Sequence, residues 1–154
     1  KEMKLLMDTT GSRVIEAFFN ILFQDTARAF DLAQEKDVGI IVKIPLDSGW
    51  LSGKYTVESE FNDIRARWSR EDKQTRAGLV EKVKAIIPNE HRIVQTAIAF
   101  CLAFDAVSTV IPGNRNIAQL NSNLASVNEP MPPELIERLQ RFYQEEVKGL
   151  NLPW

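Results

Sequence analysis

Three short apolar stretches constrain the fold of this chain more than any other feature of its sequence. They are residues 14–23 (VIEAFFNILF), 39–46 (GIIVKIPL) and 106–111 (AVSTVI). Each is largely continuous in its apolar character instead of alternating, and glycine, proline or polar residues bound it. Continuous apolar runs of this length are typical of strands that are buried on both faces. The sequence therefore predicts three strands of a parallel sheet.

Helical patterns lie between and after these stretches. Their apolar residues recur at helical spacing, and the last helix is expected to open at Pro132 and Pro133, because proline suits a first turn. The predicted helices are residues 26–37, 77–87, 91–104, 117–127 and 132–147, after a helix-like start, KEMKLLM. Alternating helices and strands indicate right-handed crossover units around a parallel sheet, which is an α/β fold.

Composition excludes several classes of protein. The 154 residues are 44% hydrophobic, which suits one domain, and their net charge of −2 predicts no nucleic-acid partner. No apolar run approaches 18 residues, so no membrane segment is expected. The only cysteine, Cys101, favours a reducing cytoplasm and is expected to be a core residue. The only histidine, His91, makes a histidine-based metal site within this chain impossible.

The residues that follow the second apolar stretch are candidates for binding phosphate. Ligands of α/β folds bind at the carboxyl ends of the parallel strands. Here the sequence is PLDSGWLSGKY, at the start of a long polar connection over residues 47–76. Gly49 and Gly53 would let the backbone approach a ligand, and Ser48, Ser52 and Lys54 carry suitable donors. The alternative is an ordinary turn whose glycines serve only its geometry.

A second candidate follows the third stretch. Arg115, Gln119 and Asn123 are spaced to form one stripe of a helix, whose N-terminus favours an anion. The alternative is a solvated polar face with Asn114 or Asn116 as the N-cap. The opposite, apolar stripe is expected to pack on the sheet; it consists of Ile117, Leu120, Leu124 and Val127.

Two charged and two aromatic residues have open interpretations. Glu16 and Lys43 lie within the first and second apolar stretches, so each either faces a polar site or lies at the edge of the sheet, and the two charges could also pair with each other. Trp50 and Trp68 flank the long connection, where they either wall a pocket or anchor the loop.

Four segments together resemble one known family. They are FFNILFQ (residues 18–24), GIIVKIPLDSGWLSGKY (39–55), FNDIRARWS (61–69) and STVIPGNRNIAQLNSN (108–123). In these motifs the chain is similar to the C-terminal half of the aldo-keto reductases. The resemblance implies the C-terminal part of a (β/α)₈ barrel, with the three strands as its sixth to eighth. Residues 1–154 would then be a single partial domain, since a whole barrel takes about 250 residues.

The resemblance also implies the cofactor NADP(H) and a small carbonyl substrate, which is reduced by hydride transfer. The loop after the second strand would hold the pyrophosphate and ribose, and the last motif would hold the adenine end and the 2′-phosphate. Arg65 or Arg67 would cover the cofactor. Glu16 takes the place of a glutamine that bonds the nicotinamide carboxamide, and Lys43 that of a stacking aromatic residue. The implied cofactor-binding residues are Glu16, Lys43, Pro45, Leu46, Ser48, Gly49, Leu51, Ser52, Lys54, Arg65, Gly113, Arg115, Gln119 and Asn123.

No catalytic residue is expected in this chain. The family's tyrosine acid and its lysine, aspartate and histidine partners belong to the first half of the barrel, and Tyr55 and Tyr143 lie in the wrong context for that tyrosine. The chain alone should therefore lack turnover. The alternatives are a non-catalytic module that senses NADP(H), and a free-standing α/β domain without a ligand. Unpaired sheet edges predict either a missing N-terminal half of the barrel as the partner or self-association through those edges.

Overall fold

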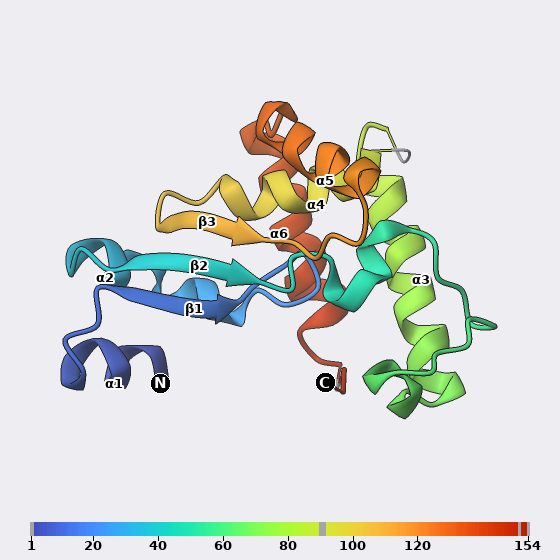
Figure 1. Cartoon of the computed structure of the whole chain (residues 1–154), viewed down its shortest axis with the longest axis horizontal. Coiled ribbons are helices and arrows are strands. Elements are labelled where there is room, and N and C mark those ends of the chain that lie inside the picture. Colours follow the sequence, from blue (N-terminus) through green and yellow to red (C-terminus); the bar gives the residue numbers. More distant parts are fainter. Residues whose placement is uncertain (1, 90–91, 151, 154) are drawn as a thin grey trace.

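A computed structural model describes residues 2–89, 92–150, 152 and 153 of the chain. Its three strands are parallel and form one sheet in the order β1 (Val14–Phe18), β2 (Gly39–Lys43) and β3 (Val107–Ile111). Helices connect successive strands (Figure 1). The structure confirms the predicted α/β fold with three parallel strands.

Each predicted helix has a counterpart. Pro133 occupies the first turn of the last helix, as expected, and a π-helical turn extends that helix toward residue 147. His91 lies outside the described residues. The α-helices are α1 (Glu2–Thr9), α2 (Phe30–Glu35), α3 (Arg70–Ile86), α4 (Ile93–Leu102), α5 (Ile117–Leu124) and α6 (Pro133–Phe142). The shorter turns are η1 (Asp25–Ala29), η2 (Asp47–Ser52), η3 (Ile64–Arg67), η5 (Ala125–Asn128) and η6 (Tyr143–Val147).

Helix α3 begins at Arg70, well before the predicted residue 77, so the long irregular connection is shorter than expected. A capping box starts the helix. The Ser69 hydroxyl accepts a hydrogen bond from the Asp72 N–H (3.0 Å), and the Asp72 carboxylate accepts one from the Ser69 N–H (2.8 Å). The start of α3 was missed because its first turns are polar and show no apolar periodicity. The serine and aspartate three residues apart were a usable signal of a helix N-terminus.

The strands are covered on one face only, so the prediction of burial on both faces is wrong for this structure. In β1, Ile15 and Ala17 are buried while Val14 is 53% exposed, and in β2 Ile40 and Val42 are fully buried. Helix α2 packs on β2 and helix α4 packs on β3. We call the uncovered side the open sheet face; its side chains include Val14, Glu16, Phe18, Ile41, Lys43, Thr109 and Ile111.

Strand β1 also ends earlier than predicted, because the apolar run turns after Phe18. The Asn20 side chain accepts a hydrogen bond from the Leu22 N–H (2.8 Å), and the backbones of Asn20 and Phe23 bond each other. Phe19 then packs in the core against Phe100, with ring centroids 5.6 Å apart. The residues after β1 are apolar because they fill the core, although they are not part of the strand.

Helix α5 presents its apolar stripe to solvent, which corrects the prediction that this stripe packs on the sheet. Ile117 is 76% exposed and Leu124 60% exposed. The polar side of the helix packs on α4 instead: the Gln95 amide donates to the Ser122 hydroxyl (2.7 Å), and Ser126 of η5 is buried. Hydrogen bonds to α4 therefore determine which face of α5 turns inward.

Cys101 is a core residue, as predicted. Its side chain is fully buried, and burial raises the pKa of the thiol far above its ordinary value. Within the described part of the chain, no helix has both the length and the apolar character needed to cross a membrane.

Candidate functional site

The backbone leaves β2 through an unusual series of left-handed residues. Ile44, Asp47 and Ser48 all have positive φ, at 55°, 49° and 55°. Side chains other than glycine adopt this region at a cost, most of all β-branched ones, so surrounding contacts must hold the turn. One such contact is Asn20, which is fully buried and donates to the Ile44 carbonyl (3.0 Å). The ends of β1 and β2 are therefore tied together where ligands of α/β folds bind.

The loop of residues 45–54, which we call the phosphate loop, contains two 3₁₀ turns between Asp47 and Ser52 that are separated by a kink at Ser48 and Gly49. Gly49 is required there, because its φ is +101° and a Cβ would lie only 2.8 Å from the Tyr55 ring. Ser48, Gly49, Ser52 and Leu46 are partly exposed and Lys54 is exposed. Pro45 and Leu51 are buried, so they shape the loop from the core side. Their contact with a cofactor stays a prediction, as it does for the rest of the loop.

Arg65 is held over the phosphate loop by a network of contacts. Its guanidinium pairs with Asp63 (Nη2 to Oδ2, 2.5 Å) and donates to the Tyr55 hydroxyl (2.5 Å) and to the Ser48 carbonyl (3.4 Å). It also lies over the Phe61 ring, 4.9 Å from the centroid. The hydrogen bond from Arg65 lowers the pKa of Asp63 to about 2. Arg65 thus lies over the loop with its charge paired to Asp63.

The turn before α5 is organised by the amides that the sequence singled out. Asn116 is the N-cap, since its side chain accepts from the Gln119 N–H (2.9 Å), which confirms one of the two expected caps. The Gln119 side chain accepts from the Arg115 N–H (2.7 Å). The Asn123 amide donates to the Asn114 side chain (2.7 Å) and to the Gly113 carbonyl (3.4 Å). These amides order the turn, and the Arg115 side chain is exposed.

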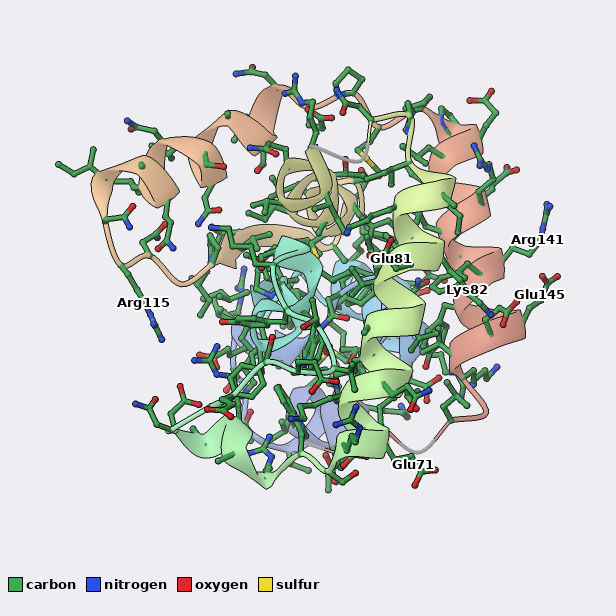
Figure 2. All side chains as sticks on the ribbon, turned by 90° about the vertical axis from the view of Figure 1, so that its right-hand side faces the viewer. Glu71, Glu81, Lys82, Arg115, Arg141 and Glu145 are labelled. Atoms are coloured by element: carbon green, nitrogen blue, oxygen red, sulfur yellow. The ribbon has the colours of Figure 1, made fainter. Side chains whose placement is uncertain are left out.

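Arg115 and the Asp63–Arg65 pair lie on the same side of the molecule. The charge of Arg115 contributes to lowering the pKa of Asp63, which places the two groups within Coulombic reach of each other. Figure 2 shows Arg115 projecting from the turn before α5 toward the side of the molecule where η3 lies. The fold therefore brings two arginines, from segments far apart in the sequence, to the carboxyl ends of β2 and β3.

Glu16 and Lys43 form an ion pair on the open sheet face, with 3.3 Å between Lys43 Nζ and Glu16 Oε1. The pairing interpretation is therefore confirmed. For the two tryptophans the loop-anchoring interpretation is confirmed, because Trp50 is fully buried and Trp68 is 5% exposed. Their rings pack against each other with centroids 5.8 Å apart.

Of the two tyrosines, one lies beside this site and the other does not. The Tyr55 hydroxyl bonds Arg65, and Tyr143 is buried elsewhere, where burial and the nearby Asp25 raise its pKa. Two hollows of the surface also lie away from the predicted cofactor residues. One is lined by Leu22, Tyr143 and Leu152 among others, and the other lies between α1 and η1.

Several residues of the site were missed by the sequence reasoning. Asp63 had a usable signal, because an aspartate two residues before Arg65 in a loop is typical of a side-chain-capped turn, and its side chain accepts from the Arg65 N–H (3.0 Å). Asp47 and Arg76 form a buried ion pair between the phosphate loop and α3. They are 29 positions apart, and no local pattern connects them.

Comparisons with known proteins agree with this fold. The model of the "Aldo/keto reductase family" matches residues 4–144. The solved structure of aldo-keto reductase AKR11C1 from Bacillus halodurans, in its holo form, is 20% identical with a TM-score of 0.71; the match covers 99% of this chain and 50% of that one. The glycerol dehydrogenase AKR11B4 from Gluconobacter oxydans is 13% identical with a TM-score of 0.76, over 99% of this chain and 49% of that one.

The chain spans about half the length of these solved structures and has the fold of the C-terminal part of a (β/α)₈ barrel. The family match extends over nearly the whole chain, from within α1 to the start of η6. The chain therefore belongs to the aldo/keto reductase family.

Proposed function

We propose that this chain supplies the cofactor-binding half of an NADP(H)-dependent carbonyl reductase. The observation that carries the proposal is the convergence of the phosphate loop, Arg65 and Arg115 at the carboxyl ends of β2 and β3. Two guanidinium groups beside a turn fit a ligand with separate phosphates, because arginine binds phosphate oxygens in a bidentate manner. The 2′-phosphate and the pyrophosphate of NADP(H) are such a pair of groups.

The residues present fit this cofactor. Arg115 is exposed and can approach the 2′-phosphate, while Gln119 and Asn123 hold the turn that carries it. Ser48 and Ser52 of the phosphate loop offer hydroxyl groups that are partly exposed. On the open sheet face, Glu16 can accept a hydrogen bond from a carboxamide N–H₂. When bound, NADPH supplies a hydride to a carbonyl carbon of a small substrate.

This chain's own contribution is to bind and orient the cofactor. Arg65 is poised over the Ser48 carbonyl and can exchange its contact with Asp63 for a phosphate oxygen. The resemblance to the family places the general acid in the first half of the barrel, so we expect it to come from outside this chain. The buried, reduced Cys101 suits a cytoplasmic protein.

The partner that completes the site is part of the same proposal. The open sheet face and the unpaired outer sides of β1 and β3 would be covered by the remaining strands of a barrel, supplied by an N-terminal half. Alone, the chain is expected to self-associate through these edges. Sedimentation of a well-folded monomer of 17.5 kDa at all concentrations would overturn this part of the proposal.

The test of the cofactor proposal is a titration of the 154-residue chain with NADPH and with NADH, followed by nicotinamide fluorescence and by calorimetry. Saturable binding that favours NADPH supports the proposal, and the absence of binding to either cofactor overturns it. A mixture of the chain, NADPH and a small aldehyde is expected to show no loss of nicotinamide absorbance. Turnover by the chain alone would contradict the proposal that the general acid comes from the N-terminal half of the barrel.

The second candidate is a non-catalytic module that senses the redox state of NADP(H). The contact that Arg65 donates to the Tyr55 hydroxyl is compatible with it, because a module that only binds the cofactor needs no proton donor. A sensor must bind the two redox states unequally. A dissociation constant for NADPH that differs several-fold from that for NADP⁺, with no turnover after addition of the N-terminal half, would support this candidate.

A further inference from the structure

The buried ion pair between Asp47 and Arg76 has no part in the proposed cofactor contacts. Arg76 is a residue of α3 with an exposed fraction of 0%, and Asp47, at the start of the phosphate loop, is 1% exposed. The Arg76 Nε donates to Asp47 Oδ2 at 3.3 Å. Burying two charges is costly unless pairing and hydrogen bonds offset the lost hydration, so the contacts that surround this pair matter for its stability.

Arg76 also holds the end of the chain. Its Nη2 donates to the backbone carbonyl of Pro153 at 2.8 Å, and the Trp68 Nε1 donates to the same carbonyl at 3.2 Å. The guanidinium lies over the Trp68 ring, 4.7 Å from its centroid. In Figure 1 the C-terminal segment runs from α6 to the region of η3 and the start of α3. The Pro153 carbonyl therefore accepts from Trp68, just before α3, and from Arg76, on α3.

The phosphate loop needs such support. Asp47 and Ser48 are both left-handed without being glycine, and residues in that region persist only where their surroundings hold them. The aromatic residues around the loop pack on one another: the Trp50 ring contacts Tyr55 at 5.7 Å and Trp68 at 5.8 Å. Trp68 is thus shared by the loop, by Arg76 and by the Pro153 carbonyl.

We propose that Arg76 and Trp68 are positioning residues, which couple the backbone carbonyl of Pro153 to Asp47 and so hold the phosphate loop in its binding conformation. The effect of this positioning role on ligand affinity rests on the proposed function. Its effect on the conformation of the loop is independent of any ligand. Neither residue has to touch a ligand, because both act through Asp47 and the aromatic packing beneath the loop.

The simpler alternative is that Arg76 and Trp68 stabilise the whole domain without a particular effect on the loop. Hydrogen exchange separates the two, because it reports local opening amide by amide. The loop carries three reporters: the Gly49 and Leu51 amides donate to the Leu46 carbonyl, and the Gly53 amide donates to the Trp50 carbonyl. Amides of β2 and α4 report the stability of the core.

The experiment measures amide exchange of the full chain by NMR, without ligand, in Trp68→Phe, Arg76→Met and the control Arg70→Met. Trp68→Phe keeps an aromatic ring and removes one donor, so exchange at Gly49, Leu51 and Gly53 is expected to rise about 2- to 10-fold more than exchange of the core amides. Arg70 lies on the same helix in an exposed pair with Glu58 and is expected to leave the loop unaffected.

The ligand arm uses NADPH as the probe with Trp68→Phe, whose dissociation constant is expected to rise by about the same 2- to 10-fold. If the wild-type chain binds no NADPH, the proposed function fails, while the exchange data still decide the positioning role. Equal acceleration of loop and core amides, or none in the loop, would overturn the inference. Because Arg76→Met leaves Asp47 unpaired and can unfold the domain, Trp68→Phe is the deciding variant.

Discussion

Glu16 and Lys43 pair across two neighbouring parallel strands, with 3.3 Å between carboxylate and ammonium, on the open sheet face. In the register Glu16 lies opposite Ile41 and Lys43 opposite Phe18, so the pair is diagonal. Both side chains are about half exposed, at 53% and 44%. An ion pair in such a setting contributes at most about 1 kcal/mol to stability. Its position beside the proposed nicotinamide site therefore matters more than its strength.

Glu16→Gln should strengthen the binding of NADPH. A glutamine can accept from the carboxamide N–H₂ and also donate to its oxygen, and one added hydrogen bond corresponds to about 2- to 10-fold in the dissociation constant. The free energy of unfolding should change by less than about 1 kcal/mol. Calorimetric titration checks the first value and urea unfolding the second. Glu58→Gln, which breaks an exposed pair with Arg70, is the control, and weaker binding by Glu16→Gln would contradict the assignment.

Arg115→Ala should reduce the preference for NADPH over NADH. The guanidinium is exposed beside the turn that Gln119 and Asn123 order, and it has the charge to bind a 2′-phosphate. Loss of a charge-assisted contact of this kind costs about 1.5–3 kcal/mol, or about 10- to 150-fold in affinity. The measurement is the ratio of the two dissociation constants. Arg141→Ala, on α6 and the far side of the molecule in Figure 2, should leave the ratio unchanged.

Gly49→Ala and Gly78→Ala should have opposite effects on stability. At Gly49 the φ is +101° and a Cβ would lie 2.8 Å from the Tyr55 ring, so we expect any side chain there to cost about 1–3 kcal/mol. Gly78 lies inside α3 with open space around it, and alanine there should add about 0.5–1 kcal/mol. Urea unfolding of both variants is the measurement. Equal tolerance at the two positions would contradict the conformation of the phosphate loop.

The fold could be predicted from the sequence because its signals are local. Apolar runs, the paired prolines before α6 and the spacing in α4 each identify an element within a few residues. The start of α3 was missed because Ser69 and Asp72 cap a polar first turn. Burial of the strands on both faces was overestimated, since the apolar pattern is that of a closed barrel whereas the described chain covers one face.

The candidate site was only partly predictable, for a physical reason. Gly49, Arg65 and Arg115 were identified from motifs, but their contacts depend on tertiary packing. Arg65 is held by Asp63 and Tyr55, and α5 turns its polar side inward because Gln95 bonds Ser122. Helical spacing identifies two faces of α5 without saying which one the neighbouring helix will bind.

Leu124→Glu should weaken self-association of the isolated chain. Leu124 is 60% exposed on the apolar stripe of α5, the helix that follows the unpaired edge strand β3. A carboxylate there opposes burial against a second surface, because its hydration would be lost. Sedimentation velocity over a range of concentrations should show a shift toward monomer. Ile64→Lys, at a 71% exposed position on η3, is the control, and the same shift in both variants would exclude a specific role for the stripe.

Asp47→Asn should remove a pH dependence in which the free energy of unfolding falls as the pH rises, the opposite of what a carboxylate with a lowered pKa produces. Burial raises the pKa of Asp47 from 3.8 to about 6, although Arg76 acts to lower it. Between about pH 4 and pH 6 the folded state therefore binds a proton that the unfolded state has released. The free energy of unfolding consequently falls as the pH rises through this window, by about 3 kcal/mol for a shift of about two units.

The measurement is urea unfolding of the wild type and Asp47→Asn at several pH values between about 4 and 7. The difference in unfolding free energy, wild type minus variant, should decrease as the pH rises. The contributions of the other carboxylates to the pH dependence cancel in this difference, because both proteins contain them. Asp63 is one of them, and its lowered pKa makes the unfolding free energy rise with pH. A difference that rises with pH would show that the attraction of Arg76 outweighs the burial of Asp47. The ion pair would then stabilise the fold on its own, instead of depending on the packing that buries it.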